Sequence, residues 1–138
     1  MVAHISSILT VDDDPIFQEL IKASIAARGI EGVQQAGNES EAIAVINSNP
    51  CIDLIVTDLL MPDIDGSDLL RHLKVTRNKT PLIIVSSALA PTIAAVEALA
   101  ASYELNFLGT LSKPLDFEQF EHILLSAGLQ LQPLENAG

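Results

Sequence analysis

The stretch that decides the fold is Ile52-Asp53-Leu54-Ile55-Val56-Thr57-Asp58-Leu59-Leu60-Met61-Pro62-Asp63-Ile64-Asp65-Gly66. It starts with a short apolar run, Leu54 to Val56, which is typical of a strand buried on both faces of a sheet. The run ends at Asp58, and the loop that follows is rich in Pro, Asp and Gly, so no strand continues through it. In an open parallel sheet, ligands and chemistry lie just beyond the carboxyl ends of the strands. We therefore interpret Asp58 as a nucleophile on the rim of a sheet that accepts a phosphoryl group.

The same pattern, an apolar strand followed by an amphipathic helix, repeats five times along the chain. We expect strands at about residues 5–11, 32–36, 54–58, 82–85 and 107–111, and helices at about 15–29, 38–49, 66–77, 91–103 and 116–128. Asn38 with Glu41 three residues later has the spacing of a capping box, and Asp116 begins the last helix in the same way. This alternation predicts an α/β fold, a doubly wound parallel sheet with helices on both faces. We expect one domain over residues 1–128 and a tail or linker over 129–138, where no period is visible.

Length and composition restrict the class of protein. The 138 residues, 49% hydrophobic and 18% charged, suffice for one domain with a real core and are not typical of a disordered chain. The net charge of −11 argues against direct binding of nucleic acid and favours basic partners or divalent cations. No apolar run is long enough to span a membrane and no signal peptide is recognisable, so we expect a cytoplasmic domain without membrane contact. The single cysteine, Cys51, cannot form an internal disulfide, and we expect it at the buried edge of a strand.

Four of the expected strands end in polar residues: Asp12 and Asp13 after the first, Asp58 after the third, Ser86 after the fourth and Lys113 after the fifth. Right-handed crossovers place these strand ends at one edge of the sheet, so we expect the side chains to converge. Carboxylates this close repel one another unless a hard divalent cation neutralises them, and Mg²⁺ is the usual choice where phosphate is handled. Ser86 and Lys113 would contact phosphoryl oxygens, and Asp58 would attack the phosphorus to form an acyl phosphate.

Together these motifs resemble the receiver domain of bacterial two-component response regulators, over about residues 7–127. The matching motifs are Val11-Asp12-Asp13-Asp14-Pro15, Thr57-Asp58, Met61-Pro62, Asp65-Gly66, Pro81-Leu82-Ile83-Ile84-Val85-Ser86 and Lys113-Pro114. Residues 105–115 are further similar to receivers attached to EAL-type cyclic-di-GMP phosphodiesterase domains.

The resemblance implies a flavodoxin-like sheet of order 2-1-3-4-5, with the five strands numbered along the chain, and a cis bond before Pro114. It also implies that Asp58 takes its phosphoryl group from a phosphohistidine of a sensor kinase or phosphotransfer protein. Such a domain is not an enzyme, although it assists its own phosphorylation and dephosphorylation. Any enzymatic output would lie in a further domain.

The resemblance also assigns roles to the other residues of the site. Asp12, Asp13 and Asp58 would hold Mg²⁺, with the backbone carbonyl of Leu60 as a further ligand. Ser86 and Lys113 would contact the phosphoryl group and relay the change to an output surface. That surface would consist of the fourth helix, the fifth strand and the fifth helix, and would bind an output domain or a second copy of the chain.

Two features of the fourth and fifth repeats affect this output surface. The family usually has an aromatic residue three positions before the strand-end lysine, where this chain has Thr110. A small hydroxyl side chain cannot make the same swing, so we expect a different relay. The helix over 91–103 is rich in alanine and has few polar residues, which is consistent either with a partner surface or with close packing of small side chains.

Two other functions are compatible with parts of the sequence. One is a pseudo-receiver, an interaction module that is never phosphorylated, which Thr110 keeps open. The other is a phosphatase of the haloacid dehalogenase type, because Asp12 and Asp14 resemble its first motif. That alternative leaves Asp58 unexplained. An acyl phosphate on Asp58 would indicate a receiver, and one on Asp12 a phosphatase.

Overall fold

The computed structural model describes residues 3–49, 51–58, 67–87, 90–113 and 115–131 of the chain. The strands are β1 (Ala3–Ile5), β2 (Ser7–Val11), β3 (Gly32–Ala36), β4 (Leu54–Asp58), β5 (Leu82–Ser86), β6 (Phe107–Ser112) and β7 (Leu129–Leu131). The helices are α1 (Pro15–Ala26), α2 (Glu39–Ser48), α3 (Ser67–Val75), α4 (Ala90–Ser102) and α5 (Phe117–Ser126). None of these helices is long and apolar enough to cross a bilayer.

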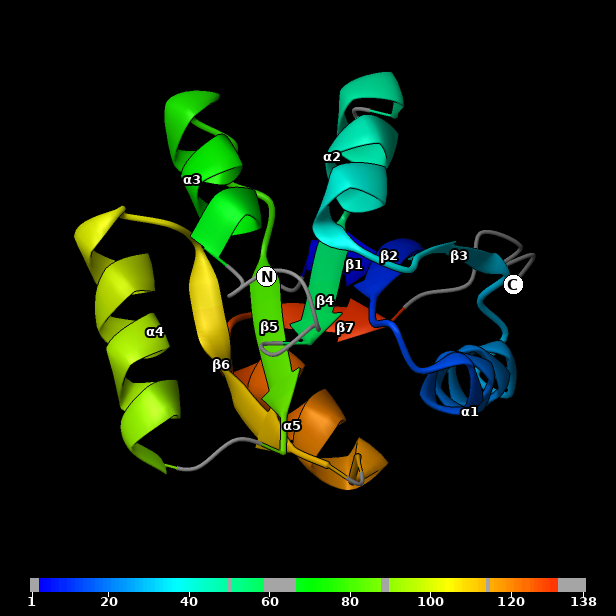
Figure 1. Cartoon of the computed structure of the whole chain (residues 1–138). Helices are drawn as coiled ribbons and strands as arrows, with labels where there is room; N and C mark the ends of the chain where they lie inside the picture. Colours follow the sequence, from blue (N-terminus) through cyan, green and yellow to red (C-terminus); the bar gives the residue numbers. More distant parts are fainter. Residues whose placement is uncertain (1–2, 50, 59–66, 88–89, 114, 132–138) are drawn as a thin grey trace.

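The main sheet is parallel and has the order β3-β2-β4-β5-β6 (Figure 1). Numbered along the chain without β1, this is the expected order 2-1-3-4-5, and the doubly wound α/β architecture is confirmed. Side chains alternate between its two faces, as the pleat of a strand requires. Ile8 packs with α1 and α5 on one face, and Leu9 packs with α2 and α3 on the other. Helix α4 covers the second face beside α3 (Figure 1).

The helix starts follow from capping. The Asn38 side chain accepts a hydrogen bond from the Glu41 N–H at 2.9 Å, and the Glu41 carboxylate accepts one from the Gly37 N–H at 2.9 Å. Asp14 and Asp116 cap α1 and α5 through a shorter loop, because each side chain accepts a hydrogen bond from the N–H two residues on, at 2.9 Å. The predicted N-caps at Asn38 and Asp116 are confirmed, and they fix where α2 and α5 begin.

The single strand expected over 5–11 is wrong, because the chain kinks at Ser6. One oxygen of Asp53 accepts hydrogen bonds from the Ser6 and Ser7 N–H groups at 3.0 and 3.1 Å, which turns β1 away from the sheet. Gly32 permits the kink, since a Cβ there would lie 2.6 Å from the Ser6 carbonyl oxygen. Strand β1 then pairs in parallel with β7, within the segment that we expected to be a tail. The leucines at 129 and 131 pack against the core formed with α1 and α5.

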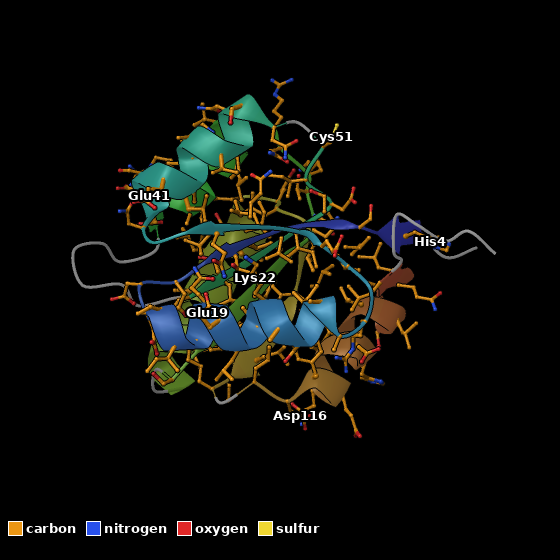
Figure 2. The ribbon with its side chains drawn as sticks, turned by 90° about the vertical axis from the view of Figure 1, so that its right-hand side faces the viewer. His4, Glu19, Lys22, Glu41, Cys51 and Asp116 are labelled. Atoms are coloured by element: carbon orange, nitrogen blue, oxygen red, sulfur yellow. The ribbon has the colours of Figure 1, made fainter. Side chains whose placement is uncertain are left out.

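One further expectation was wrong, and two others lie outside the described residues. Cys51 is exposed rather than buried, because it lies in the turn before β4 and Ile52 is the first residue there to enter the core (Figure 2). Strand β6 contains a bulge, at which Leu82 pairs with Phe107 but Ile83 pairs with Gly109. The Leu60 carbonyl and the peptide bond before Pro114 lie outside the described residues.

Candidate functional site

Three aspartates gather at the carboxyl edge of the sheet. Asp58 is the last residue of β4, and Asp12 and Asp13 directly follow β2, which is its neighbour in the sheet. One carboxylate oxygen from each lies within 4.8 Å of the others. Asp12 and Asp58 are buried, with 2% and 8% of their surface exposed, whereas Asp13 is exposed. The structure therefore brings together the three acids that the sequence placed at separate strand ends.

Lys113 lies between two of these acids. Its Nζ donates to Asp12 Oδ2 at 2.6 Å, lies 3.5 Å from Asp58 Oδ2, and is 4.4 Å from the centre of the Phe17 ring. Burial alone would lower the pKa of Lys113. The hydrogen bond to Asp12 and the charges of Asp58 and Asp12 outweigh it, so the pKa is raised above its ordinary 10.5. The lysine is thus a cation held inside the acidic cluster, where it offsets the repulsion between the carboxylates.

Ser86 completes the set of predicted strand-end residues. It is buried at the end of β5, and Val85, the residue before it, pairs with Asp58. The Lys113 N–H donates to the Ser86 carbonyl oxygen at 3.1 Å, so the backbones of the two residues are joined. The residues at the carboxyl ends of β2, β4, β5 and β6 therefore meet at one edge of the sheet, in the order in which the strands lie side by side.

Gln18 supports the acidic cluster from α1, and the sequence analysis missed it. Its side chain is buried, and its Nε2 donates to the carbonyl oxygens of Asp12 at 3.1 Å, Ala36 at 3.0 Å and Thr10 at 3.4 Å. Its Oε1 accepts a hydrogen bond from the Thr10 hydroxyl at 2.5 Å. One amide thus fixes the ends of β2 and β3 directly beneath Asp12. The signal was present, because Gln18 shares the buried stripe of α1 with Ile21 and Ile25 and is polar.

Glu39 is a second buried polar residue that the sequence analysis missed. It lies in the first turn of α2 with 1% of its surface exposed, and its Oε2 accepts a hydrogen bond from the Leu69 N–H at 2.7 Å. This contact caps the first turn of α3 from another helix. A negative charge at a helix N-terminus is favourable, so Glu39 fixes how α3 begins after the segment that follows Asp58.

Thr110 replaces the aromatic residue usual at its position and makes a specific contact. Its hydroxyl donates to Glu97 Oε2 at 2.9 Å, which joins β6 to α4. Glu97 is the only charged residue in α4, and both side chains are partly buried. The contact links the strand that ends near Lys113 to the helix of the expected output surface.

The donor set fits a hard divalent cation. Carboxylate oxygens are the ligands that Mg²⁺ prefers, and ligands on opposite sides of such an ion are about 4 Å apart. The oxygens of Asp12, Asp13 and Asp58 lie within 4.8 Å of one another, so modest adjustment would bring all three onto one ion. Asp14 and Asp116, which cap helices, do not belong to the cluster.

Comparisons with known proteins agree with this geometry. Residues 8–125 match the family model described as response regulator receiver domain. The chain is 31% identical over 134 residues to the cyclic di-GMP phosphodiesterase RocR of Pseudomonas aeruginosa, covering 93% of this chain and 33% of RocR. It superposes on a response regulator receiver protein from Pseudomonas putida with a TM-score of 0.73 and 27% identity, covering 91% of this chain and 99% of that one. It shares the fold of TrrA from Thermotoga maritima, which was solved with Mg²⁺ and BeF, at 22% identity, TM-score 0.72 and coverage of 88% and 98%.

The chain therefore belongs to the response regulator receiver domain family. It is a receiver domain of the two-component response regulators and a signalling module. This assignment favours the receiver over the phosphatase alternative, which had left Asp58 unexplained. The chain spans about a third of the length of RocR and under half that of the MprA response regulators that it also matches.

Proposed function

We propose that Asp58 is the phosphoacceptor and takes a phosphoryl group from the phosphohistidine of a sensor kinase or phosphotransfer protein. A carboxylate oxygen of Asp58 attacks the phosphorus while the bond to the histidine nitrogen breaks, and that nitrogen leaves with the electron pair. The observation that supports this role most strongly is Lys113, whose Nζ lies 3.5 Å from Asp58 and 2.6 Å from Asp12. The lysine can pass from Asp12 to a phosphoryl oxygen without leaving the site.

Asp12, Asp13 and Asp58 would hold Mg²⁺, together with the backbone carbonyl of Leu60, which lies outside the described residues. When bound, the ion offsets negative charge on the phosphoryl group. Gln18 keeps the Asp12 backbone in place beneath this site, and Ser86 offers a hydroxyl to another phosphoryl oxygen. Because phosphoryl transfer depends on alignment and charge neutralisation, these roles suffice for acceptance.

Acetyl phosphate labelling tests this proposal. With Mg²⁺ present, wild-type protein should gain one phosphoryl group, and the Asp58→Asn variant should gain none. Asp68→Asn, the same substitution at an exposed carboxylate of α3, should label as the wild type does. Labelling of Asp58→Asn at the normal rate would move the acceptor elsewhere. Absence of labelling in wild-type protein would instead favour the pseudo-receiver.

Beryllofluoride and thermal melting test the metal. We expect beryllofluoride to bind only when Mg²⁺ is present, because the acidic cluster repels an anion on its own. Millimolar Mg²⁺ should raise the melting temperature, since an ion that binds only the folded state stabilises it. An unchanged melting temperature would contradict the metal site.

The partners dock on different sides of the domain in this proposal. Next to the site, α1 exposes Ile16 and Leu20, with 71% and 62% of their surfaces accessible, and these would contact the phosphodonor. The output surface would be α4, β6 and α5, where α4 presents exposed alanines. The Thr110–Glu97 hydrogen bond would carry a shift of Lys113 and Ser86 to α4 in place of an aromatic swing. An output domain or a second copy of the chain would bind there.

A cyclic-di-GMP phosphodiesterase output is a candidate for the regulated activity. It is supported by the similarity of residues 105–115 to receivers of that kind and by the relation to RocR. The sequence encoded beyond Gly138 in the gene tests it. An EAL-type domain there would support this output, and a helix-turn-helix would exclude it.

A further inference from the structure

Positive charge is concentrated in one segment of this acidic chain. Between Asp68 and Glu97 the sequence contains four lysines and arginines and no acidic residue. The rest of the chain contains three lysines and arginines and eighteen acidic residues. The four cations lie on α3 and in the turn that leads to β5. They are Lys74, Arg77, Lys79 and Arg71, and Arg71 lies 3.4 Å from the carboxylate of Asp68. An acidic protein with one positive face attracts acidic partners at that face and repels them elsewhere.

This face is hollowed where the helices end, at the edge of the sheet opposite to the aspartates. Between the ends of α2 and α3, which lie side by side in Figure 1, is a groove of about 430 Å³. Its apolar lining includes Ile52 and Ile55, and its polar lining includes Asn47, His72, Arg77 and Lys79. A second hollow of about 390 Å³ lies on the α4 side and shares Arg77 and Lys79. Both cations therefore stand on the ridge between two concave surfaces.

No carboxylate of the described chain pairs with the cations of this ridge. Lys79 donates to the Glu104 backbone carbonyl at 2.6 Å, and Lys74 lies 4.7 Å above the Tyr103 ring. The side chain of Arg77 has no ion pair within the described residues. The nearest acidic lining residue, Glu104, belongs to the second hollow, and no described residue that lines the first groove is acidic. These charges are available to a partner.

The backbone of Arg77 turns left-handed where α3 ends, as that of Glu104 does after α4. The φ of Arg77 is +55°, and its N–H bonds the Lys74 carbonyl oxygen at 3.1 Å, as at the end of a helix that turns left-handed. Glycine or asparagine is the favoured residue in such a position. A cation at the end of a helix also favours the helix dipole, which accounts for Lys74 within the last turn. Lys79 lies beyond α3, where the dipole effect has fallen off.

We propose that this ridge and groove bind a carboxylate-rich segment of a partner protein. Arg77 and Lys79 would pair with its carboxylates, and an apolar side chain of the segment would lie against the exposed edges of Ile46 and Ile52. A short segment fits this volume, whereas nucleic acid would bring many phosphates close to the strongly acidic remainder of the chain. Asp58 is not among the residues that line this groove.

Fluorescence anisotropy with a labelled Glu-Leu-Glu-Glu-Leu-Glu peptide tests the proposal. We expect the peptide to bind, the binding to weaken with salt, and the matched Gln-Leu-Gln-Gln-Leu-Gln peptide to bind at least about tenfold more weakly. Arg77→Gly should weaken binding about fivefold or more while keeping or raising the melting temperature, because glycine suits the left-handed backbone. Lys79→Gln should weaken it similarly. Lys22→Gln, on α1 at the opposite face of the sheet, should bind as the wild type does (Figure 2).

Several results would overturn the proposal. Absence of binding at millimolar protein would do so, as would equal binding of the two peptides, which would indicate apolar contact alone. Wild-type affinity in Arg77→Gly would place the peptide elsewhere, and loss of binding in Lys22→Gln would indicate a non-specific charge effect. Tighter binding of a single-stranded oligonucleotide, competing with the peptide, would identify the face as a nucleic-acid surface instead.

Discussion

The two edges of one sheet handle charge in opposite ways. At the carboxyl edge, three aspartates at the ends of two strands gather, and Lys113 at the end of a third strand lies 2.6 Å from Asp12 and 3.5 Å from Asp58. At the amino edge, the ridge of Arg77 and Lys79 has no carboxylate partner among the described residues. The first cluster is partly compensated by its own lysine, and its carboxylate oxygens lie close enough together to share one cation. The second is uncompensated and open, which suits the recruitment of a charged partner.

Removing the internal cation should have the largest effect, because it makes the carboxyl edge as uncompensated as the amino edge. Lys113→Met should bind Mg²⁺ about tenfold more tightly than wild type, since the ion no longer competes with an ammonium group for Asp12. Isothermal titration calorimetry measures this. Without metal the variant should be less stable by about 1–2 kcal/mol, because buried carboxylates lose their partner. Equal or weaker Mg²⁺ binding would show that Lys113 does not compete with the ion.

Because the pKa of Lys113 is raised in the folded protein, the stability that this lysine gives to the carboxyl edge should depend on pH. A lysine whose pKa is higher in the folded state than in the unfolded state stabilises the fold fully at pH values below its unfolded-state pKa. This stabilisation is lost as the pH rises through the folded-state pKa. In metal-free buffer, wild type should therefore lose stability relative to Lys113→Met above about pH 10.5. Urea unfolding at alkaline pH measures the difference. A constant difference between pH 8 and pH 12, roughly spanning the transition, would contradict the compensation.

Gln18→Leu tests whether the compensated edge depends on its support from α1. The substitution removes hydrogen bonds to the carbonyl oxygens of Asp12 and Ala36 and should cost about 1–3 kcal/mol of stability. It should also weaken Mg²⁺ binding severalfold, which a purely structural role would not require. Gln35→Ala, which removes an exposed amide that donates to the Gln18 backbone, is the matched control. Normal Mg²⁺ affinity in a destabilised Gln18→Leu would limit Gln18 to folding.

Thr110→Val tests the link between the acidic edge and α4. Loss of the hydroxyl should destabilise the protein by about 0.5–1.5 kcal/mol and increase hydrogen exchange in α4. Glu97→Gln keeps an acceptor for the hydroxyl and should have the smaller effect. If beryllofluoride with Mg²⁺ changes α4 exchange equally in Thr110→Val and wild type, this hydrogen bond is not the relay.

Asn78→Asp should have the smallest effect of these substitutions. It places a negative charge beside the positive charges of the amino edge. Asn78 Oδ1 accepts from the Thr80 N–H and hydroxyl at 2.9 and 2.6 Å, and an aspartate can keep both bonds. The new carboxylate beside Arg77 and Lys79 should change stability by no more than about 1 kcal/mol. It should also weaken binding of the acidic peptide about twofold to threefold, because one new carboxylate offsets only part of the charge of the ridge. Unchanged peptide binding would show that the charge of the ridge is irrelevant.

The parts of the fold that the sequence predicted depend on periodicity and on strand ends. The apolar run before Asp58 and the caps at Asn38 and Asp116 are local signals, and local hydrogen bonds satisfy them in the structure. The convergence of Asp12, Asp58 and Lys113 followed from parallel topology alone.

The missed features arise between elements that are distant in the sequence. Strands β1 and β7 have three residues each, too few to show a period, and they exist because they pair with each other. Gln18 lies on the buried stripe of α1, but its hydrogen-bond partners lie on other elements, as does that of Glu39, so these contacts were not visible locally. Cys51 was expected to be buried but is exposed, because the buried stretch begins one residue later, at Ile52.

The most direct test of the central claim is the position of the acyl phosphate. Wild-type protein is incubated with acetyl phosphate and Mg²⁺, reduced with borohydride, and mapped by peptide mass spectrometry, since reduction converts an aspartyl phosphate to homoserine. We predict conversion at Asp58 alone. Conversion at Asp12 or Asp13 while Asp58 remains intact would contradict the assignment.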